Sequence, residues 1–138
     1  MSAPAVAVSA DGKKFAAAWK DVRTGTNSVY WSISDSPTFT KDSPVHSKFG
    51  VEQNHPSIAF DSSETIWVAW EESQLKSQKI WIRSSVDADK GRALSDENDG
   101  WASFPTVASN GGIVGVVYET EKDAERGVTF CLIESVQK

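Results

Sequence analysis

The feature of this chain that most limits its possible folds is an apolar run, closed by an aromatic and an acidic residue, that occurs three times. The copies read FAAAWKD at 15–21, IWVAWEE at 66–72 and, more loosely, VGVVYET at 114–120. A proline-led extended segment and a turn rich in Gly, Asp or Ser precede each copy, and a further extended run such as SVYWSIS follows it. Repeats of this kind are typical of folds in which similar units stack on one another.

The run at 15–21 is apolar on both faces if it is a strand. Alternate residues of a strand share a face, so Phe15, Ala17 and Trp19 lie on one side and Ala16 and Ala18 on the other. Such a strand has to be covered on both sides. The alignment of the copies also predicts equivalent buried positions for Trp19, Trp70 and Tyr118.

The repeat predicts an all-β chain of about three four-stranded propeller blades, because no segment keeps a helical period and the units recur about every 50 residues. Residues 1–138 then form a single repeat domain with blades at roughly 4–55, 56–104 and, incompletely, 105–138. Fourth strands are expected near Val45 and near Trp101. A two-sheet sandwich is the alternative, but it does not explain an aligned repeat. The other strands are expected to start near Pro4, Phe15, Val29, Pro56, Ile66, Lys79, Pro105, Ile113 and Val128.

Composition and charge exclude several classes of function. A net charge of −5 argues against nucleic acid as a partner, because nonspecific binding to phosphates depends on clustered Lys and Arg. No window approaches the roughly 20 apolar residues of a membrane-spanning helix, so no membrane partner is expected. The start of the chain has no secretory signal, which predicts a cytoplasmic protein or a part of an exported one. The single cysteine, Cys131, excludes an intrachain disulfide and a thiolate zinc site, and no cofactor is expected.

With these motifs the chain resembles the sialidase-like propeller superfamily, whose blades are also called bacterial neuraminidase or Asp-box repeats. The shared pattern is Pro-x-Val/Ile-Ala, a turn, an apolar run ending in Ala-Trp-acidic, and an aromatic strand that ends in serine. The family's Asp box, Ser-x-Asp-x-Gly-x-Thr-Trp, joins the third and fourth strands of a blade. The segment SDSPTFT at 34–40 resembles a degraded box without its glycine.

The resemblance implies a propeller whose function has to be argued from its site, because the family includes exo-sialidases, lectins and binding modules without chemistry. A sialidase-type enzyme would need an arginine cluster, a Tyr with a neighbouring Glu as nucleophile, and an Asp acid/base. This sequence offers Arg23 and Arg83, with Tyr118 beside Glu119, and lacks the family's Arg-Ile-Pro stretch. We therefore expect a noncatalytic binding module for glycan or protein ligands, with a fragment or half of a sialidase-like glycoside hydrolase as the alternative.

Loops after the second strand and before the first strand of each blade would meet at the channel mouth, which is the usual ligand face of a propeller. The candidate ligand-binding residues on these loops are Asp21, Arg23, Asn54, His55, Glu71, Glu72 and Glu119. Tryptophans invite a glycan interpretation because an indole face can stack on a sugar ring. Most of the six tryptophans are assigned to the core, and Trp101, which follows a loop glycine, is as open to exposure as to burial.

The acidic segment at 87–99 is a candidate calcium site, because its Asp and Asn side chains are hard oxygen donors close in sequence. Its spacing is not that of an EF-hand, and a solvated connection is the expectation.

Three blades do not close a ring, since propellers have about four to eight blades. The sequence therefore predicts either a homodimer that completes a six-bladed ring or the remainder of a longer chain. In the dimer, SAPAVAV of one copy would lie near VTFCLIES of the other.

Overall fold

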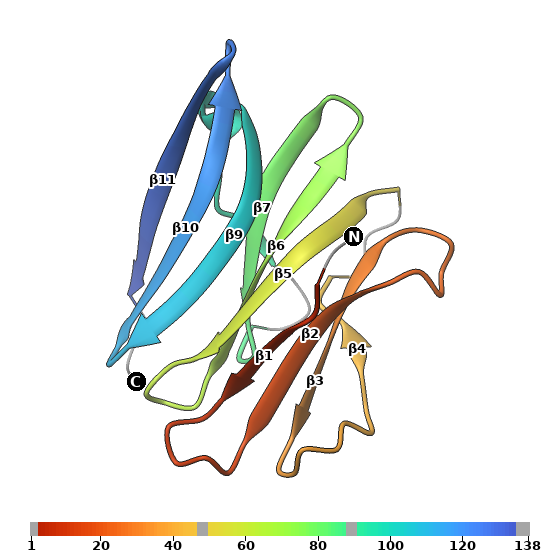
Figure 1. Cartoon of the computed structure of the whole chain (residues 1–138), viewed down its shortest axis with the longest axis vertical. Coiled ribbons are helices and arrows are strands. Elements are labelled where there is room, and N and C mark those ends of the chain that lie inside the picture. The colour runs from red at the N-terminus through yellow and green to blue at the C-terminus, as the bar shows by residue number, and fades with distance from the viewer. Residues whose placement is uncertain (1–2, 47–49, 88–90, 135–138) are drawn as a thin grey trace.

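Three antiparallel sheets stacked in chain order make up the computed structural model of this protein, which describes residues 3–46, 50–87 and 91–134 (Figure 1). The first sheet contains β1 (Ala5–Val8), β2 (Phe15–Asp21), β3 (Ser28–Ser34) and β4 (Ser43–Pro44). The second contains β5 (Glu52–Phe60), β6 (Ile66–Gln74), β7 (Ser77–Ser84) and β8 (Arg92–Ala93), and the third contains β9 (Trp101–Asn110), β10 (Ile113–Lys122) and β11 (Glu125–Glu134). Each sheet is a meander in which every strand pairs with the next one along the chain.

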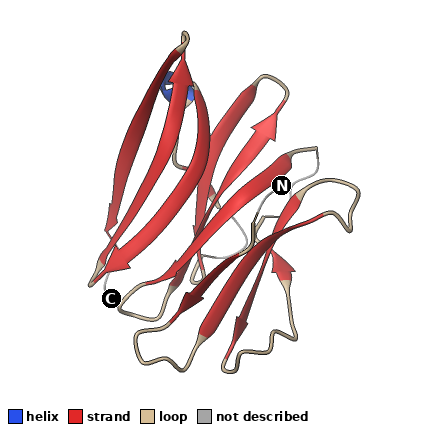
Figure 2. Cartoon of the chain, viewed as in Figure 1, coloured by secondary structure: helices blue, strands red, loops and turns tan. Residues whose placement is uncertain are grey.

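The expected all-β class is confirmed. The described residues contain a single helical turn, the 3-10 segment η1 (Glu97–Asp99), between the second and third sheets (Figure 2). Among the described residues no helix has the length and apolar character needed to cross a membrane.

Strand pairing puts the three repeat copies in one common register. Residues Ala18, Ala69 and Val117 pair with Ala5, Ser57 and Thr106 of the strand before them. Trp19, Trp70 and Tyr118 are therefore equivalent, as the alignment predicts. Trp70 and Tyr118 are fully buried, whereas Trp19 is only partly buried.

Pro56 and Pro105 lie inside strands, four residues after the starts of β5 and β9, and not at the strand starts that the sequence predicts. Both prolines follow a residue with positive φ, His55 at 47° and Phe104 at 53°. At these places the register of β5 against β6 and of β9 against β10 shifts by one residue. A β-bulge tolerates proline because the bulged residues leave the ladder and need no N–H donor.

The early start of β9 also shows that one fourth strand was predicted at the wrong place. Trp101 opens β9 and belongs to the third sheet, while the fourth strand of the second sheet is β8. The other expectation fits, because β4 ends next to Val45, whose N–H donates to Val29 O over 2.9 Å.

Two apolar cores hold the sheets together, one on each face of the second sheet. Sheets one and two share a core of Ala16, Ala18, Val29, Trp31, Val45, Ile58, Phe60, Ile66, Val68 and Trp70. Sheets two and three share Ala69, Ile80, Ile82, Ala102, Val107, Val114, Val116, Tyr118 and Ile133. We call the face of a sheet toward the preceding sheet its N-side face and the opposite one its C-side face. First strands β1, β5 and β9 lie side by side along the inner edge of the stack (Figure 1).

Candidate functional site

The predicted ligand residues lie at one end of each sheet, where β2, β6 and β10 end and where β5 begins. We call this the bulge end, because the bulges of β5 and β9 are located there. Pairing of Asn54 with Glu71 and of Ser103 with Glu119 brings the strand ends together.

His55, Glu71 and Phe104 form a connected group at the bulge end, which we call the bulge cluster. Glu71 is 3% exposed; its Oε2 lies 2.8 Å from His55 Nδ1, and its Oε1 accepts the backbone N–H of Phe104 over 2.7 Å. The His55 and Phe104 rings meet edge to face, with centroids 4.8 Å apart. One carboxylate oxygen of Glu71 thus holds His55 within the second sheet, and the other ties this sheet to the third.

Backbone strain accompanies this cluster. Left-handed φ values are uncommon for residues that carry a Cβ, and they cost of order 1–3 kcal/mol each. His55 and Phe104 adopt them at the same register position of successive sheets. Beside them, Asn27 Nδ2 donates to Asn54 Oδ1 over 3.3 Å, so the β5 bulge is also tied to the first sheet.

Asp21 and Arg23 form a separate group on the first sheet. Arg23 Nη2 lies 2.6 Å from Asp21 Oδ2, and Asp42 accepts from both Nη atoms of Arg23 over 3.1 Å. The guanidinium lies 4.3 Å from the ring centroid of Tyr30. Hydrogen bonds from Arg23 lower the pKa of Asp21, and the same bonds raise the pKa of Arg23. Arg23 is therefore already held by two carboxylates and would bind a ligand carboxylate only in competition with them.

Glu72 is placed inside the protein, with 5% exposure. Its Oε2 accepts from Gln53 Nε2 over 3.4 Å and from Trp70 Nε1 over 3.3 Å, and it lies 3.4 Å from His46 Nδ1. Glu71 and Glu72 are adjacent in a strand and so point to opposite faces, Glu72 to the N-side face. Its predicted role in ligand binding stays a prediction, without a surface position to support it.

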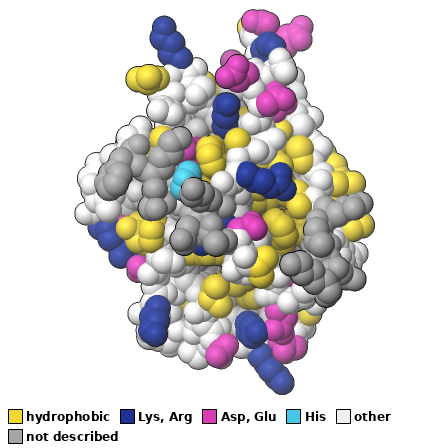
Figure 3. Space-filling model, turned by 180° about the vertical axis from the view of Figure 1, so that it is seen from behind, with side chains coloured by type: hydrophobic (Ala, Val, Ile, Leu, Met, Phe, Trp, Pro, Cys, Tyr) yellow, Lys and Arg dark blue, Asp and Glu magenta, His cyan; other side chains and the backbone are white. Residues whose placement is uncertain are grey.

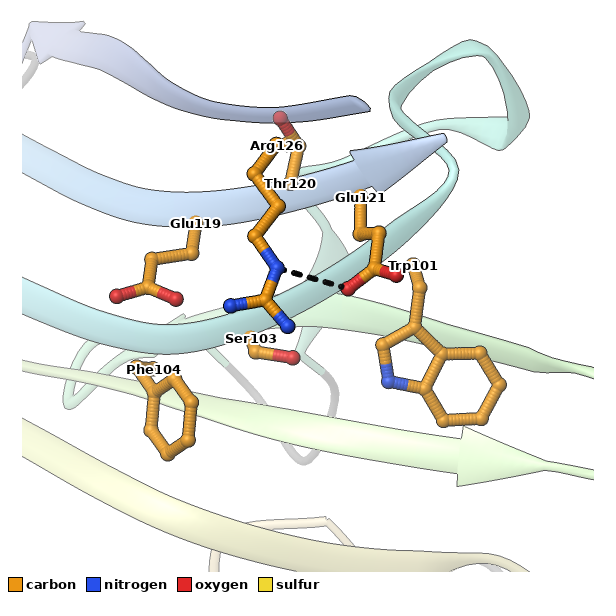
Figure 4. Close-up of a pocket in the computed structure, with 7 residues that line it drawn as sticks. All are labelled: Trp101, Ser103, Phe104, Glu119, Thr120, Glu121 and Arg126. Carbon is orange, nitrogen blue, oxygen red and sulfur yellow. Dashed lines mark ion pairs between the residues drawn. The ribbon is translucent and has the colours of Figure 1, made fainter. Parts of the chain in front are cut away.

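Glu119 lies in a shallow pocket of about 130 Å³ on the third sheet (Figure 4). The lining residues are Trp101, Ser103, Phe104, Glu119, Thr120, Glu121 and Arg126. Arg126 from β11 reaches across β10, and its Nε lies 3.4 Å from Glu121 Oε2 (Figure 4). Trp101 is 43% exposed, and Phe104 is 53% exposed and shared with the bulge cluster.

A tyrosine nucleophile assisted by its neighbour is not favoured by this geometry. Tyr118 faces the core between the second and third sheets, whereas Glu119 is exposed in the pocket. Burial raises the pKa of Tyr118, and its hydroxyl lies 3.3 Å from Asp99 Oδ2 and 3.8 Å from Cys131 Sγ. A buried phenol with a raised pKa resists ionisation.

The acidic segment at 87–99 is described except for residues 88–90. Asp96 and Asp99 cap η1: Asp96 Oδ1 accepts from Asn98 N over 2.6 Å, and Asp99 Oδ2 accepts from Asp96 N over 2.8 Å. Within the described ranges no group of three or more His, Cys, Asp or Glu side chains is arranged to hold a metal ion.

Sequence reasoning missed Phe104 as a site residue. The signal was present, because Phe104 precedes Pro105 as His55 precedes Pro56. The predicted residues that the structure brings into direct contact are Asp21 with Arg23 and His55 with Glu71.

Comparison with known proteins gives a similarity of fold but no match to a family. No family model matches the chain, and no curated protein matches it. Among solved structures it is similar to the crystal structure of an endo-1,4-beta-xylanase from Bacteroides thetaiotaomicron VPI-5482, with a TM-score of 0.56 and 14% identity. The similarity covers 99% of this chain and 53% of the xylanase chain, so this chain spans about half of that protein's length.

Proposed function

We propose that this chain is a noncatalytic binding module of the β-propeller type, in which each sheet is a blade and a glycan binds at the bulge end. The bulge cluster carries the proposal. Two successive sheets present a ring, His55 or Phe104, from a strained backbone at the same register position. Strained backbone of this kind is often found at ligand-binding sites, where the surrounding structure holds it in place.

The chemistry of the cluster fits a sugar. A half-exposed Phe104 ring offers an apolar surface on which a pyranose can stack, and the imidazole of His55 and the amides of Asn27 and Asn54 can bond to hydroxyl groups. Glu71 contributes by fixing His55 and Phe104 and not by direct contact, because both of its oxygens are engaged. A rigid site of this type keeps the entropic cost of binding low.

Three observations support blades as the architecture. The sheets share one register, their first strands lie side by side, and each C-side face inside the chain is covered by the next sheet. The turn between β3 and β4, where the resembled family has its Asp box, is closed by Ser34, whose hydroxyl donates to Thr38 O over 2.8 Å. The sialidase-like resemblance remains part of this proposal.

The alternative is a part of a glycoside hydrolase. It is less well supported, because Glu71 is buried with both oxygens bonded, Arg23 is paired with two carboxylates and Tyr118 is buried. The comparison protein is called an endo-1,4-beta-xylanase, which makes linear β-1,4-xylohexaose a suitable first probe.

Isothermal titration with β-1,4-xylohexaose, cellohexaose and a sialyllactose tests the proposal. We expect one of them to bind without cleavage, and Phe104→Ala to weaken that binding about two- to tenfold, since stacking on an aromatic ring is worth about 0.5–1.5 kcal/mol. Leu75→Ala, in the β6–β7 turn and 98% exposed, is the matched control. Equal binding by Phe104→Ala would contradict the site, and release of shorter sugars would favour the hydrolase.

A further inference from the structure

The C-side face of the third sheet lacks the cover that the same face of the second sheet has. Strand pairing makes Val128 and Phe130 of β11 equivalent to Ile80 and Ile82 of β7. Ile80 and Ile82 are 0% and 1% exposed, because the third sheet covers them, whereas Val128 and Phe130 are 71% and 63% exposed. Leu132 adds a further exposed apolar side chain to this face.

The N-side face of the first sheet is open in the corresponding way. Val6 and Val8 of β1 are equivalent to Ile58 and Phe60 of β5. Ile58 and Phe60 are buried against the first sheet, whereas Val6 and Val8 are 69% and 51% exposed. The chain thus has a bare C-side face at one end of the stack and a bare N-side face at the other.

Polar groups at the open C-side face repeat those that join the second sheet to the third. In that joint Glu71 Oε1 accepts from Phe104 N, Ser57 Oγ accepts from Val107 N over 3.0 Å, and Gln78 Nε2 donates to Ala102 O over 2.8 Å. The equivalent residues of the third sheet are Glu119, Thr106 and Arg126, all exposed. A carboxylate, a hydroxyl and a nitrogen donor are therefore present again at the same three positions.

We propose that the C-side face of the third sheet docks the N-side face of the first sheet of a second copy of this chain. The inference rests on the blade arrangement of the proposed function. Within one chain the C-side faces of the first and second sheets already pack on N-side faces, so the two bare faces are the two halves of one more such joint. Contacts of this head-to-tail kind are heterologous, and two of them close a ring of two chains.

The occupant follows from the complementarity of the faces. Glu119 and Thr106 take the places of Glu71 and Ser57, which accept the N–H groups of Phe104 and Val107. The residues of the first sheet that match these donors are Ala3, just before β1, and Val6 within β1. The pocket of Figure 4, lined by Glu119 and Arg126, would become a gap between copies. Figure 3, seen from behind, shows hydrophobic side chains across the middle of the molecule and on the side where β9–β11 lie. Contiguous apolar surface of this type usually marks an interface.

The comparison structure agrees with the size of the assembly. This chain covers 53% of the xylanase chain, so two copies supply about as much chain as that single fold contains. A second copy is therefore the occupant that we propose, and the remainder of a longer polypeptide is the competing outcome.

Light scattering on the whole chain tests the joint. We expect the mass of two chains, and the mass of one chain for Phe130→Glu and for Val6→Glu, because each variant places a charge in both joints of the ring. Leu75→Glu, an exposed turn residue outside either face, should keep the double mass. Circular dichroism confirms that each variant is folded, which is expected because Phe130 and Val6 are exposed within one chain.

Mixing the two variants is the decisive step. A ring of one Phe130→Glu chain and one Val6→Glu chain contains one doubly altered joint and one unaltered joint, so a one-to-one complex should form although neither variant associates alone. Persistence of the Val6→Glu dimer would overturn the proposal, since copies would then meet through their third sheets alone. A monomeric wild-type chain would also overturn it and would favour the longer polypeptide. Xylohexaose titration of the monomeric variants separates this failure from failure of the glycan site.

Discussion

The second and third sheets are built from the same repeat but differ in how many of their faces are covered. Their N-side faces are alike, since Trp70 and Tyr118 are equivalent and both fully buried. Their C-side faces differ completely, with Ile82 at 1% exposure and Phe130 at 63%. The difference teaches that burial in this chain is set by the neighbouring sheet and not by the apolar character of the strand. A strand of one repeat unit carries two core faces, and a unit at the end of the stack leaves one of them bare.

Truncation of the matched N-side residues should give the largest effects. Trp70→Ala and Tyr118→Ala should each lower the free energy of unfolding by about 3–5 kcal/mol, because a large aromatic side chain is removed from a closed core. Chemical denaturation with fluorescence or circular dichroism measures this. If Tyr118→Ala were nearly neutral while Trp70→Ala was severe, the third sheet would not be packed as the second is.

Truncation of the matched C-side residues should separate the two sheets. Ile82→Ala should cost about 2–5 kcal/mol of unfolding free energy, because Ile82 is enclosed by the third sheet. Phe130→Ala, measured in the dissociated chain at high dilution, should cost less than about 1 kcal/mol, as exposed side chains usually do. Equal losses would mean that Phe130 is enclosed within a single chain.

The matched carboxylates should show the same contrast at smaller size. Glu71→Gln keeps the shape but replaces one acceptor oxygen with a donor and removes the charge that bonds His55 and the Phe104 N–H, so about 1.5–3 kcal/mol of stability should be lost. Glu119→Gln should leave the stability of the dissociated chain unchanged, because Glu119 is exposed. Thermal unfolding of both variants side by side is sufficient. A larger loss for Glu119→Gln would contradict the equivalence.

Sequence reasoning recovered the repeat but not its end points, and the prolines show why. Pro56 and Pro105 are strong landmarks, and a proline is normally expected at the start of a strand. Here each strand begins four residues earlier and passes through a bulge, which depends on the conformations of His55 and Phe104. No local rule predicts a positive φ at a histidine or a phenylalanine, so the start of β9 was predicted too late and Trp101 was assigned to the wrong sheet.

The candidate site was recovered in part for a related reason. Placing Glu71 and His55 at the same end of one sheet requires only strand order, and the structure brings them within 2.8 Å. Alternation along β6 already places the side chains of Glu71 and Glu72 on opposite faces of the sheet. Which of these two side chains belongs to the bulge cluster depends on the neighbouring sheets. Burial of Glu72 against Gln53 and Trp70 is thus a property of the stack and not of the strand.

The smallest expected effect extends the comparison to the open N-side face of the first sheet. Asp21 is the register equivalent of Glu72, but no sheet covers it in this chain, and its carboxylate is paired with Arg23 near the surface. Its folded-state pKa is lowered by the hydrogen bonds from Arg23, so the pair stabilises the fold above the ordinary carboxyl pKa of about 4. This contribution should be lost as the pH falls below that value, because the unfolded chain then binds a proton that the folded chain resists. Melting temperatures measured between pH 6 and pH 2.5 should therefore fall slightly more for the wild-type chain than for Asp21→Asn, and the difference should shrink in high salt. A difference of the opposite sign would mean that folding raises the pKa of Asp21, as burial of a carboxylate without its arginine would do.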